Sequence, residues 1–167
     1  MCFVLPINVI EPPKVNDKIL VRELDLETEW KSYIDIHFTP NWGYGPDQEQ
    51  KAFLKESIDE FRKFSKNGNA LRFGAFLNDE IIAELGIYWD QGVLRFNNVG
   101  THMNYRRLGA CSTLVYEVSK SMLEKRDIKT LVMEADEDYH AAKIYESVGF
   151  SLKEKLYSVE WKSEKYQ

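Results

Sequence analysis

The chain has 167 residues, of which 44% are hydrophobic, 13% aromatic and 29% charged. A chain of this length buries about two thirds of its unfolded surface in one domain, and this composition excludes a disordered protein. Asp and Glu number 27 against 22 Lys and Arg, a net charge of −5, and nucleic-acid binding needs a basic surface instead. We therefore expect one domain over residues 1–167 and no nucleic-acid partner.

The two cysteines, Cys2 and Cys111, lie far apart and have no metal-ligand spacing, so we expect free thiols in a reducing cytosol and no metal. The first ten residues lack a basic leading segment and a cleavage site, and no apolar run reaches membrane-spanning length. These features predict a cytoplasmic protein without a membrane partner. They leave a homodimer open.

The first third of the chain predicts an arm, a strand and a helix. Residues 1–17 contain three prolines, which favour an extended arm packed on the body. Residues 19–24 alternate as a strand, and Asp25 can cap a helix over 26–37 that has an aromatic face. Residues 38–46 are rich in Pro, Gly and aromatics, which predicts a structured loop whose rings either pack down or face a ligand.

The middle of the chain predicts a helix and three antiparallel strands. The helix spans about 47–66 and ends at Asn67-Gly68. Strands over 71–77 and 81–89 read as a hairpin, and a turn then leads into a central strand over about 93–102.

The last third alternates helices and strands. A helix over about 107–125 carries an apolar stripe that must cover a sheet. The short strand 129–134 follows this helical crossover, so we expect it to run parallel to the central strand. A helix over about 138–148 comes next, then one bent or two short strands within 151–161, and a solvated tail over 162–167.

The segment that joins the central strand to the following helix suits an anion. It reads Arg106-Arg107-Leu108-Gly109. The first turn of a helix leaves backbone N–H groups without intrahelical partners and carries about half a positive charge. Gly109 lets the backbone approach a ligand closely, and the two arginines supply donors that match phosphate geometry. The sequence therefore predicts a phosphate-binding loop here.

Two motifs resemble one family. Arg106-x-x-Gly109-x-Cys111 resembles the acetyl-CoA signature of the GNAT superfamily of N-acetyltransferases: Gln or Arg, two residues, Gly, one residue, then Gly or Ala. The sequence departs from that pattern at Cys111, and at Arg107, which is often a Gly. A second block resembles the family's Asn-x-x-Ala-x-x-Leu-Tyr-x-x-x-Gly-Phe, with matching or substituting residues at Asp138, Ala141, Ile144, Tyr145, Gly149 and Phe150.

The resemblance covers about residues 18–162 and implies an α/β fold. Its sheet is mixed and mostly antiparallel, splayed between two central parallel strands, with helices on both faces. The cofactor that it implies is acetyl-CoA, with the pantetheine paired to the end of the central strand and the diphosphate on the loop. The implied cofactor-binding residues are Val99, Thr101, His102, Met103, Arg106, Arg107, Leu108, Gly109, Ala110, Cys111, Ser112, Asp138, Lys143 and Tyr145.

The implied activity is N-acetyl transfer from acetyl-CoA to a primary amine of a small molecule or peptide. Tyr145 matches a tyrosine that lies near the CoA sulfur in many relatives, where a phenol can protonate the leaving thiolate; its structural alternative is a core tyrosine. The general base is Glu84, His102 or a water chain. Glu84 can instead pair with Arg95 or Arg72, and His102 can simply hydrogen-bond the turn.

Cys111 raises the question of an acyl-cysteine mechanism. At a helix start beside two arginines, we expect its thiol pKa to fall, which favours reactivity. The helix stripe, however, turns Cys111 toward the sheet, so direct attack by the amine is the better interpretation.

The expected acceptor pocket is mostly aromatic, and its candidate residues are Trp30, Tyr33, His37, Trp42, Tyr44 and Arg95. The acidic net charge favours a cationic amine such as a polyamine, an aminoglycoside or a lysine side chain, whereas Arg95 would receive a carboxylate. Two alternatives stay open. One is a CoA-binding sensor or scaffold without catalysis, and the other is a different α/β protein that binds a phosphorylated ligand at the same helix start.

Overall fold

The structure is a computed structural model of the chain and describes residues 2–6, 10–25, 27–29, 48–125, 127–135 and 141–157. The aromatic loop, Asp138, the C-terminal tail and most of the helix expected over 26–37 lie outside these residues. No helix in the described part is both long and apolar enough to cross a membrane.

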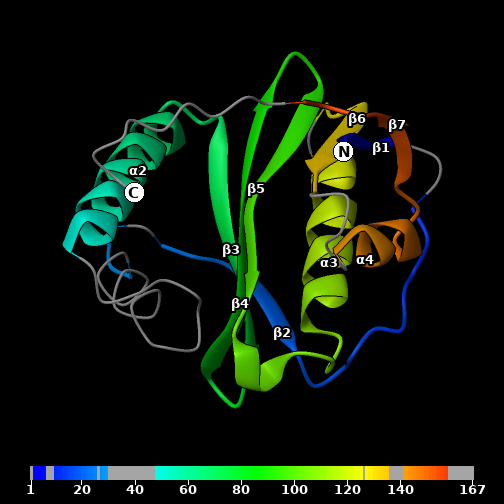
Figure 1. Cartoon of the computed structure of the whole chain (residues 1–167), viewed down its shortest axis with the longest axis horizontal. Coiled ribbons are helices and arrows are strands. Elements are labelled where there is room, and N and C mark those ends of the chain that lie inside the picture. Colours follow the sequence, from blue (N-terminus) through cyan, green and yellow to red (C-terminus); the bar gives the residue numbers. More distant parts are fainter. Residues whose placement is uncertain are drawn as a thin grey trace.

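The described residues form one mixed sheet in the order β2-β3-β4-β5-β6-β1-β7 (Figure 1). Neighbouring strands are antiparallel except β5 and β6, which are parallel as expected. The strands are β1 (Cys2–Pro6), β2 (Leu20–Glu23), β3 (Ala70–Leu77), β4 (Glu80–Asp90), β5 (Val93–Thr101), β6 (Thr130–Glu134) and β7 (Ser151–Glu154).

Helices cover both faces of this sheet. Helix α2 (Gln48–Lys66) lies on one side, and helices α3 (Ala110–Lys125) and α4 (Ala141–Ser147) lie on the other (Figure 1). The expected stripe of α3 faces the sheet, because Leu114, Val115 and Val118 are at most 1% exposed. The α/β class and the two-sided arrangement predicted from the sequence are therefore confirmed.

Two tight turns set the antiparallel part of the sheet. Asn78 and Asp79 have φ angles of 51° and 65°, and Gln91 and Gly92 have angles of 46° and 80°. Two successive residues with positive φ match the twist of a β-hairpin, and Asn, Asp and Gly tolerate this conformation best. The expected hairpin and the turn into the central strand are confirmed.

The two parallel strands part after a short contact. The register of β5 with β6 runs from Val93↔Thr130 to Arg95↔Val132, yet β5 continues to Thr101. The far half of β5 is therefore bonded to β4 along one edge and separates from β6 along the other. This is the splay that the family resemblance implied.

A bulge increases the bend of β5 at the same place. Glu84 pairs with Gly100 and Gly86 with Asn97, so β5 contains one residue more than β4 between these pairs. Asn98 lies inside this stretch with a φ of 48°. An extra residue bends a strand and increases its twist, which here turns the end of β5 away from β6.

The first strand corrects the expected role of the N-terminal arm. Residues 2–6 form β1 inside the sheet, where Phe3 pairs with Met133 and Leu5 with Leu131 of β6. Both side chains are buried, because alternate residues of a strand face the same side and this side is the core. The sequence predicted an extended arm packed on the body; these residues are extended, but they form a strand of the sheet, which the sequence did not predict.

The insertion of β1 also changes the C-terminal end of the sheet. Strand β7 ends at Glu154, and residues 155–157 are exposed and outside any strand. The neighbour of β6 is thus an N-terminal strand, and β7 pairs with β1 instead. Of the strands expected within 151–161, the described residues form one.

Replacing Leu5 by Ala tests the position of β1. Leu5 is fully buried, so we expect the variant to lose about 2–5 kcal/mol of unfolding free energy, measured by urea denaturation. The control is Val4→Ala, because Val4 points to the opposite, half-buried face of the strand. We expect this variant to lose about 1 kcal/mol of unfolding free energy. Equal losses for the two variants would contradict the insertion of β1 into the core.

Candidate functional site

The chain leaves β5 through a short turn before helix α3. His102 caps a 3₁₀ turn, Met103–Tyr105, and α3 begins at Ala110, not near Arg107 as the sequence predicted. The reason lies in the backbone, because Arg107 and Gly109 have φ angles of 66° and 82°. Residues in this left-handed conformation cannot continue a right-handed helix, so the loop 106–109 stays outside α3.

The start of α3 presents a row of backbone donors. The first bond of the helix runs from the Thr113 N–H to the Gly109 oxygen, at 2.9 Å. Within the part of the chain that the structure describes, no group accepts a hydrogen bond from the N–H groups of residues 107–112. The first turn of α3 also contains no acidic residue. Such a row of donors at the positive end of a helix dipole fits a phosphate or diphosphate.

Exposed cations stand beside these donors. Arg106 and Arg107 are exposed, and among the described residues neither forms an ion pair. Lys143 is exposed on α4, the helix that packs against α3. Because no carboxylate in the described part of the chain pairs with the arginines, both guanidinium groups can pair with a bound anion.

The splayed end of β5 offers backbone groups next to this loop. Val99, Gly100 and Thr101 are half-buried and lie beyond the last pair that β5 forms with β6. On the other edge, Gly100 pairs with Glu84, and the N–H of His102 bonds to the oxygen of Ile82 in β4. The edge toward β6 can thus receive an extended, peptide-like group as an added strand.

Cys111 directly follows the loop and Ala110, and the pKa of its thiol is raised, whereas the sequence predicted a lowered pKa. Burial raises the pKa of the Cys111 thiol to about 12, although a hydrogen bond with Thr101 lowers it in part. The side chain is partly buried and packs against the core. Desolvation favours the neutral thiol, so the expected fall of this pKa was wrong.

Glu84, a candidate base, forms a buried ion pair. Its Oε2 atom lies 2.7 Å from Nη1 of Arg72, and the two side chains are 2% and 3% exposed. The guanidinium of Arg72 also stacks 4.6 Å from the centre of the Phe61 ring of α2. Pairing with Arg72 was one of the alternatives open from the sequence, and the structure shows it.

His102, the second candidate base, forms a hydrogen bond with the turn that it caps. Its Nδ1 atom accepts a hydrogen bond from the N–H of Asn104 at 3.3 Å, and its ring lies 5.3 Å from that of Tyr105. In a neutral ring with Nδ1 as acceptor, Nε2 carries the proton and acts as a donor. The hydrogen bond with the turn, also left open from the sequence, is observed.

Tyr145 lies on α4 against the core and is 4% exposed. Its ring centre is 6.1 Å from that of Phe3 in β1 and 6.3 Å from that of Phe150. The N–H groups of Val148 and Phe150 bond to its backbone oxygen, and Gly149 ends the helix with a φ of 105° as predicted. The two phenylalanines therefore pack around the ring of Tyr145 within the core.

Of the expected acceptor-binding residues, Arg95 alone lies among the described residues. Its Nη2 atom forms an ion pair at 2.9 Å with Oε2 of Glu134 in β6, and both side chains remain about half exposed. Trp30, Tyr33, His37, Trp42 and Tyr44 lie outside the described residues. The carboxylate of Glu134 occupies the position that an acceptor carboxylate would take on Arg95.

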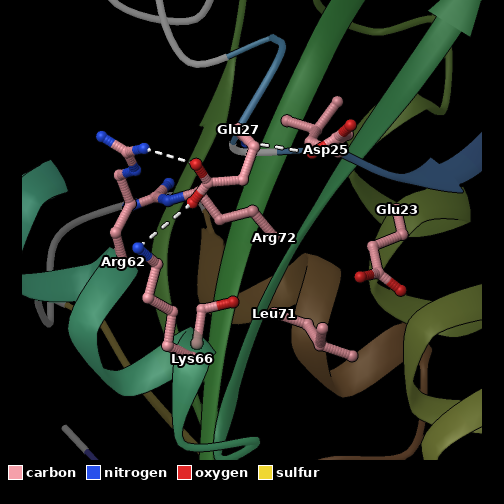
Figure 2. A pocket seen from close by; sticks show the side chains of 9 residues that line it. Glu23, Asp25, Glu27, Arg62, Lys66, Leu71 and Arg72 are labelled. Atoms are coloured by element: carbon pink, nitrogen blue, oxygen red, sulfur yellow. Dashed lines mark hydrogen bonds and ion pairs between the residues drawn. The ribbon is translucent and has the colours of Figure 1, made fainter.

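A cavity of about 200 Å³ lies apart from the loop, between α2 and the strands β2 and β3 (Figure 2). Sequence reasoning did not identify it, although Arg62 and Lys66 share one face of α2 at a spacing of four. Glu27 holds both cations, at 2.9 Å from Arg62 and 3.7 Å from Lys66. The lining residues are Glu23, Leu24, Asp25, Glu27, Arg62, Ser65, Lys66, Leu71 and Arg72.

Several solved structures share this fold at low sequence identity. A transcriptional regulator from Bacillus halodurans C-125 matches with a TM-score of 0.66 and 18% identity, over 86% of this chain and 99% of that one. An aminoglycoside acetyltransferase from an uncultured soil metagenomic sample, in complex with sisomicin, matches with a TM-score of 0.62 and 15% identity, over 89% and 98%.

A GCN5-related N-acetyltransferase from Kribbella flavida matches 90% of this chain with a TM-score of 0.61 and 13% identity. The chain spans about half the length of that protein, 52%. No curated protein matches the sequence. The sequence model of the acetyltransferase (GNAT) family matches residues 30–150, which include the loop, α3 and α4. The chain therefore belongs to the GNAT acetyltransferase family.

Proposed function

We propose that the protein is an N-acetyltransferase that moves the acetyl group of acetyl-CoA to a primary amine of a small molecule or peptide. The observation that carries this proposal is the row of N–H groups over residues 107–112, which lies beside Arg106 and Arg107. Among the described residues, these N–H groups have no acceptor and the two arginines form no ion pair. A diphosphate offers the oxygens and the charge that these donors need.

The splay supports a proposed position for the other parts of the cofactor. A pantetheine arm carries two amide groups, and the edge of β5 that faces β6 beyond Arg95, ending at Thr101, offers amide partners. Lys143 and Asp138 are proposed to contact the remaining polar parts of CoA. With the diphosphate on the loop and the arm along β5, the thioester would reach the point where β5 and β6 part.

The reaction breaks the thioester C–S bond and forms an amide C–N bond. The amine loses a proton and the departing sulfur gains one, so no other reactant is consumed. We assign the proton for the sulfur to the phenol of Tyr145, whose ring is fixed by Phe3 and Phe150. A phenol with a pKa of about 10 stays protonated at neutral pH, as this role requires.

The base has three candidates: Glu84, His102 and a chain of water molecules. Glu84 is nearly fully buried against Arg72, and Nδ1 of His102 accepts a backbone hydrogen bond. These contacts favour the water chain, because they engage one carboxylate oxygen of Glu84 and the Nδ1 atom of His102. They are also the observation that favours the alternative function, a CoA-binding sensor or scaffold without catalysis.

The acceptor is proposed to be a cationic amine. The net charge of −5 favours one, and Arg95 is already paired with Glu134, which reduces its suitability for an acceptor carboxylate. A structural neighbour was solved with sisomicin, so aminoglycosides belong in an acceptor panel together with polyamines and lysine peptides.

Thermal unfolding with CoA, acetyl-CoA and ATP tests the cofactor, and thiol release across the amine panel tests transfer. We expect CoA and acetyl-CoA to raise the unfolding temperature by mass action and at least one amine to release thiol. Arg106→Ala should weaken CoA binding about 10- to 100-fold, because it loses a charge-assisted hydrogen bond.

Lys120→Ala is the matched control for this experiment. It removes one exposed positive charge from α3, the helix that follows the loop, well past its first turn, and should bind CoA like the wild type. Stabilisation by ATP alone would contradict the assignment of CoA. Binding of CoA without thiol release from any amine would favour the non-catalytic alternative.

The variant Tyr145→Phe tests the general acid. It keeps the ring contacts with Phe3 and Phe150, so the fold should persist. Loss of the proton donor should lower kcat by about 100-fold or more while the Kd of CoA stays near that of the wild type. Full turnover by this variant would remove the acid role from Tyr145.

The raised pKa of Cys111 predicts a pH effect on stability. The folded thiol keeps its proton to about pH 12, whereas the reference value is 9.0, so between these values the folded state binds more protons than the unfolded state. The unfolding free energy should therefore fall as pH rises from 9 toward 12, and more steeply than in Cys111→Ser. Urea denaturation of both proteins across this range measures the difference.

The same thiol should take no part in turnover. A protonated, buried sulfur is a poor nucleophile, so rapid-quench mass spectrometry should find no acetyl group on Cys111. An acetylated Cys111 during turnover, or identical pH curves for the wild type and Cys111→Ser, would contradict this assignment.

A further inference from the structure

We propose that Asn16 is a positioning residue for the loop 106–109, and that its side-chain amide orients the Leu108–Gly109 peptide so that the Gly109 N–H faces the diphosphate. The inference rests on the proposed function, because it takes the loop as the CoA site. It concerns the segment 10–18, which joins β1 to β2 and has no counterpart in the two family motifs.

Asn16 is bonded to both sides of Gly109. Its Nδ2 atom donates a hydrogen bond to the backbone oxygen of Leu108 at 2.9 Å. Its backbone N–H donates to Oγ1 of Thr113 at 3.2 Å, and Thr113, in the first turn of α3, is 1% exposed. One residue, distant in sequence, therefore fixes the position of the last loop residue relative to the helix.

The first of these bonds sets the direction of a donor. In a trans peptide the C=O and N–H groups point in opposite directions, and no cis peptide bond is found among the described residues. When Asn16 holds the oxygen of Leu108, the N–H of Gly109 points away from Asn16. A hydrogen bond accepted by the C=O also polarises the same peptide, which strengthens its N–H as a donor.

The segment 10–18 also covers one side of Gly109. A Cβ atom on Gly109 would lie 3.5 Å from the oxygen of Lys14 and 3.8 Å from Cβ of Asn16. Gly109 has a φ of 82°, a conformation that L residues rarely adopt. A diphosphate therefore reaches the loop from the side opposite Lys14 and Asn16, which is the side that the N–H of Gly109 faces.

Asn16 is itself held in a rigid turn. Its Oδ1 atom accepts a bond from the N–H of Lys18 at 3.2 Å, and its backbone oxygen accepts one from Ile19 at 3.0 Å. The other end of the segment is fixed by a bond from the Glu11 N–H to the Val148 oxygen at 3.0 Å. An asparagine side chain supplies both the acceptor for Lys18 and the donor for Leu108, whereas an aspartate supplies the acceptor alone.

Two substitutions of Asn16 and one control test the proposal. Asn16→Ala and Asn16→Asp both remove the donor, and the aspartate keeps the turn acceptor. Asp17→Asn changes the neighbouring residue, which makes none of these bonds. Calorimetry with CoA should show binding about three- to tenfold weaker for Asn16→Ala than for the wild type, as expected for one lost hydrogen bond. Asp17→Asn should match the wild type.

Steady-state kinetics separates positioning from a loss of folded protein. A misplaced Gly109 N–H should raise the KM for acetyl-CoA in both Asn16 variants, with kcat and the KM for the amine unchanged. A merely structural role would lower kcat through a smaller folded fraction and leave both KM values unchanged. A pair of Thr113 variants tests the second bond of Asn16. Thr113→Ser keeps the hydroxyl that accepts the bond and should bind CoA more tightly than Thr113→Val, which lacks it.

The outcomes distinguish this inference from the proposed function. If the wild type binds CoA and Asn16→Ala binds it equally well, the role of Asn16 is overturned while the loop remains the site. If the wild type does not bind CoA, the proposed function itself fails. If Asn16→Ala does not fold, the Thr113→Ser and Thr113→Val pair decides, and equal CoA affinities in that pair overturn the inference.

Discussion

The separation of β5 from β6 is the constraint on which the site depends. Parallel strands usually pair along their length, but here the register stops at Arg95↔Val132 and a bulge near Asn98 bends β5 away. This bend leaves the edge of β5 that faces β6 with backbone groups that can bond to a ligand. After the bend, the chain passes through a 3₁₀ turn into the start of α3. The edge of β5 and the N-terminus of α3 therefore follow one another along the chain.

The start of α3 brings two opposing electrostatic effects close together. The helix dipole favours negative charge by about 0.3–1 kcal/mol, which is less than one unit of pKa, whereas burial shifts pKa values by up to about 3–5 units. On the outer side the N–H groups and Arg106 face solvent, and the dipole can act on a ligand. On the inner side Cys111 packs against the core, and desolvation keeps its thiol neutral. The same turn of helix thus suits an anion outside and an inert sulfur inside.

Local patterns predicted most of the fold. The stripe of α3, the hairpin turns at Asn78-Asp79 and Gln91-Gly92, and the stop at Gly149 all depend on residues close in sequence. The position of β1 was missed because it depends on a long-range choice. Residues 2–6 and the C-terminal segment both carry strand-like patterns, and only tertiary packing decides which one pairs with β6.

The loop itself was predictable from Arg106 and Gly109, but its boundary and its support were not. The helix starts three residues after the predicted position because Arg107 has a positive φ. Residues other than glycine rarely adopt this conformation, so the sequence gives no sign of it. The ion pair between Arg72 and Glu84 and the bonds of Asn16 join residues 12 and more than 90 positions apart. Pattern reasoning offered two partners for Glu84, and it gave no sign that Asn16 reaches the loop.

A crystal structure of the protein with CoA tests the central claim most directly. The account predicts diphosphate oxygens within hydrogen-bond distance of backbone nitrogens in the segment 107–112, and the pantetheine along the edge of β5 that faces β6. A diphosphate bound elsewhere, with those nitrogens bonded to protein groups, would contradict it.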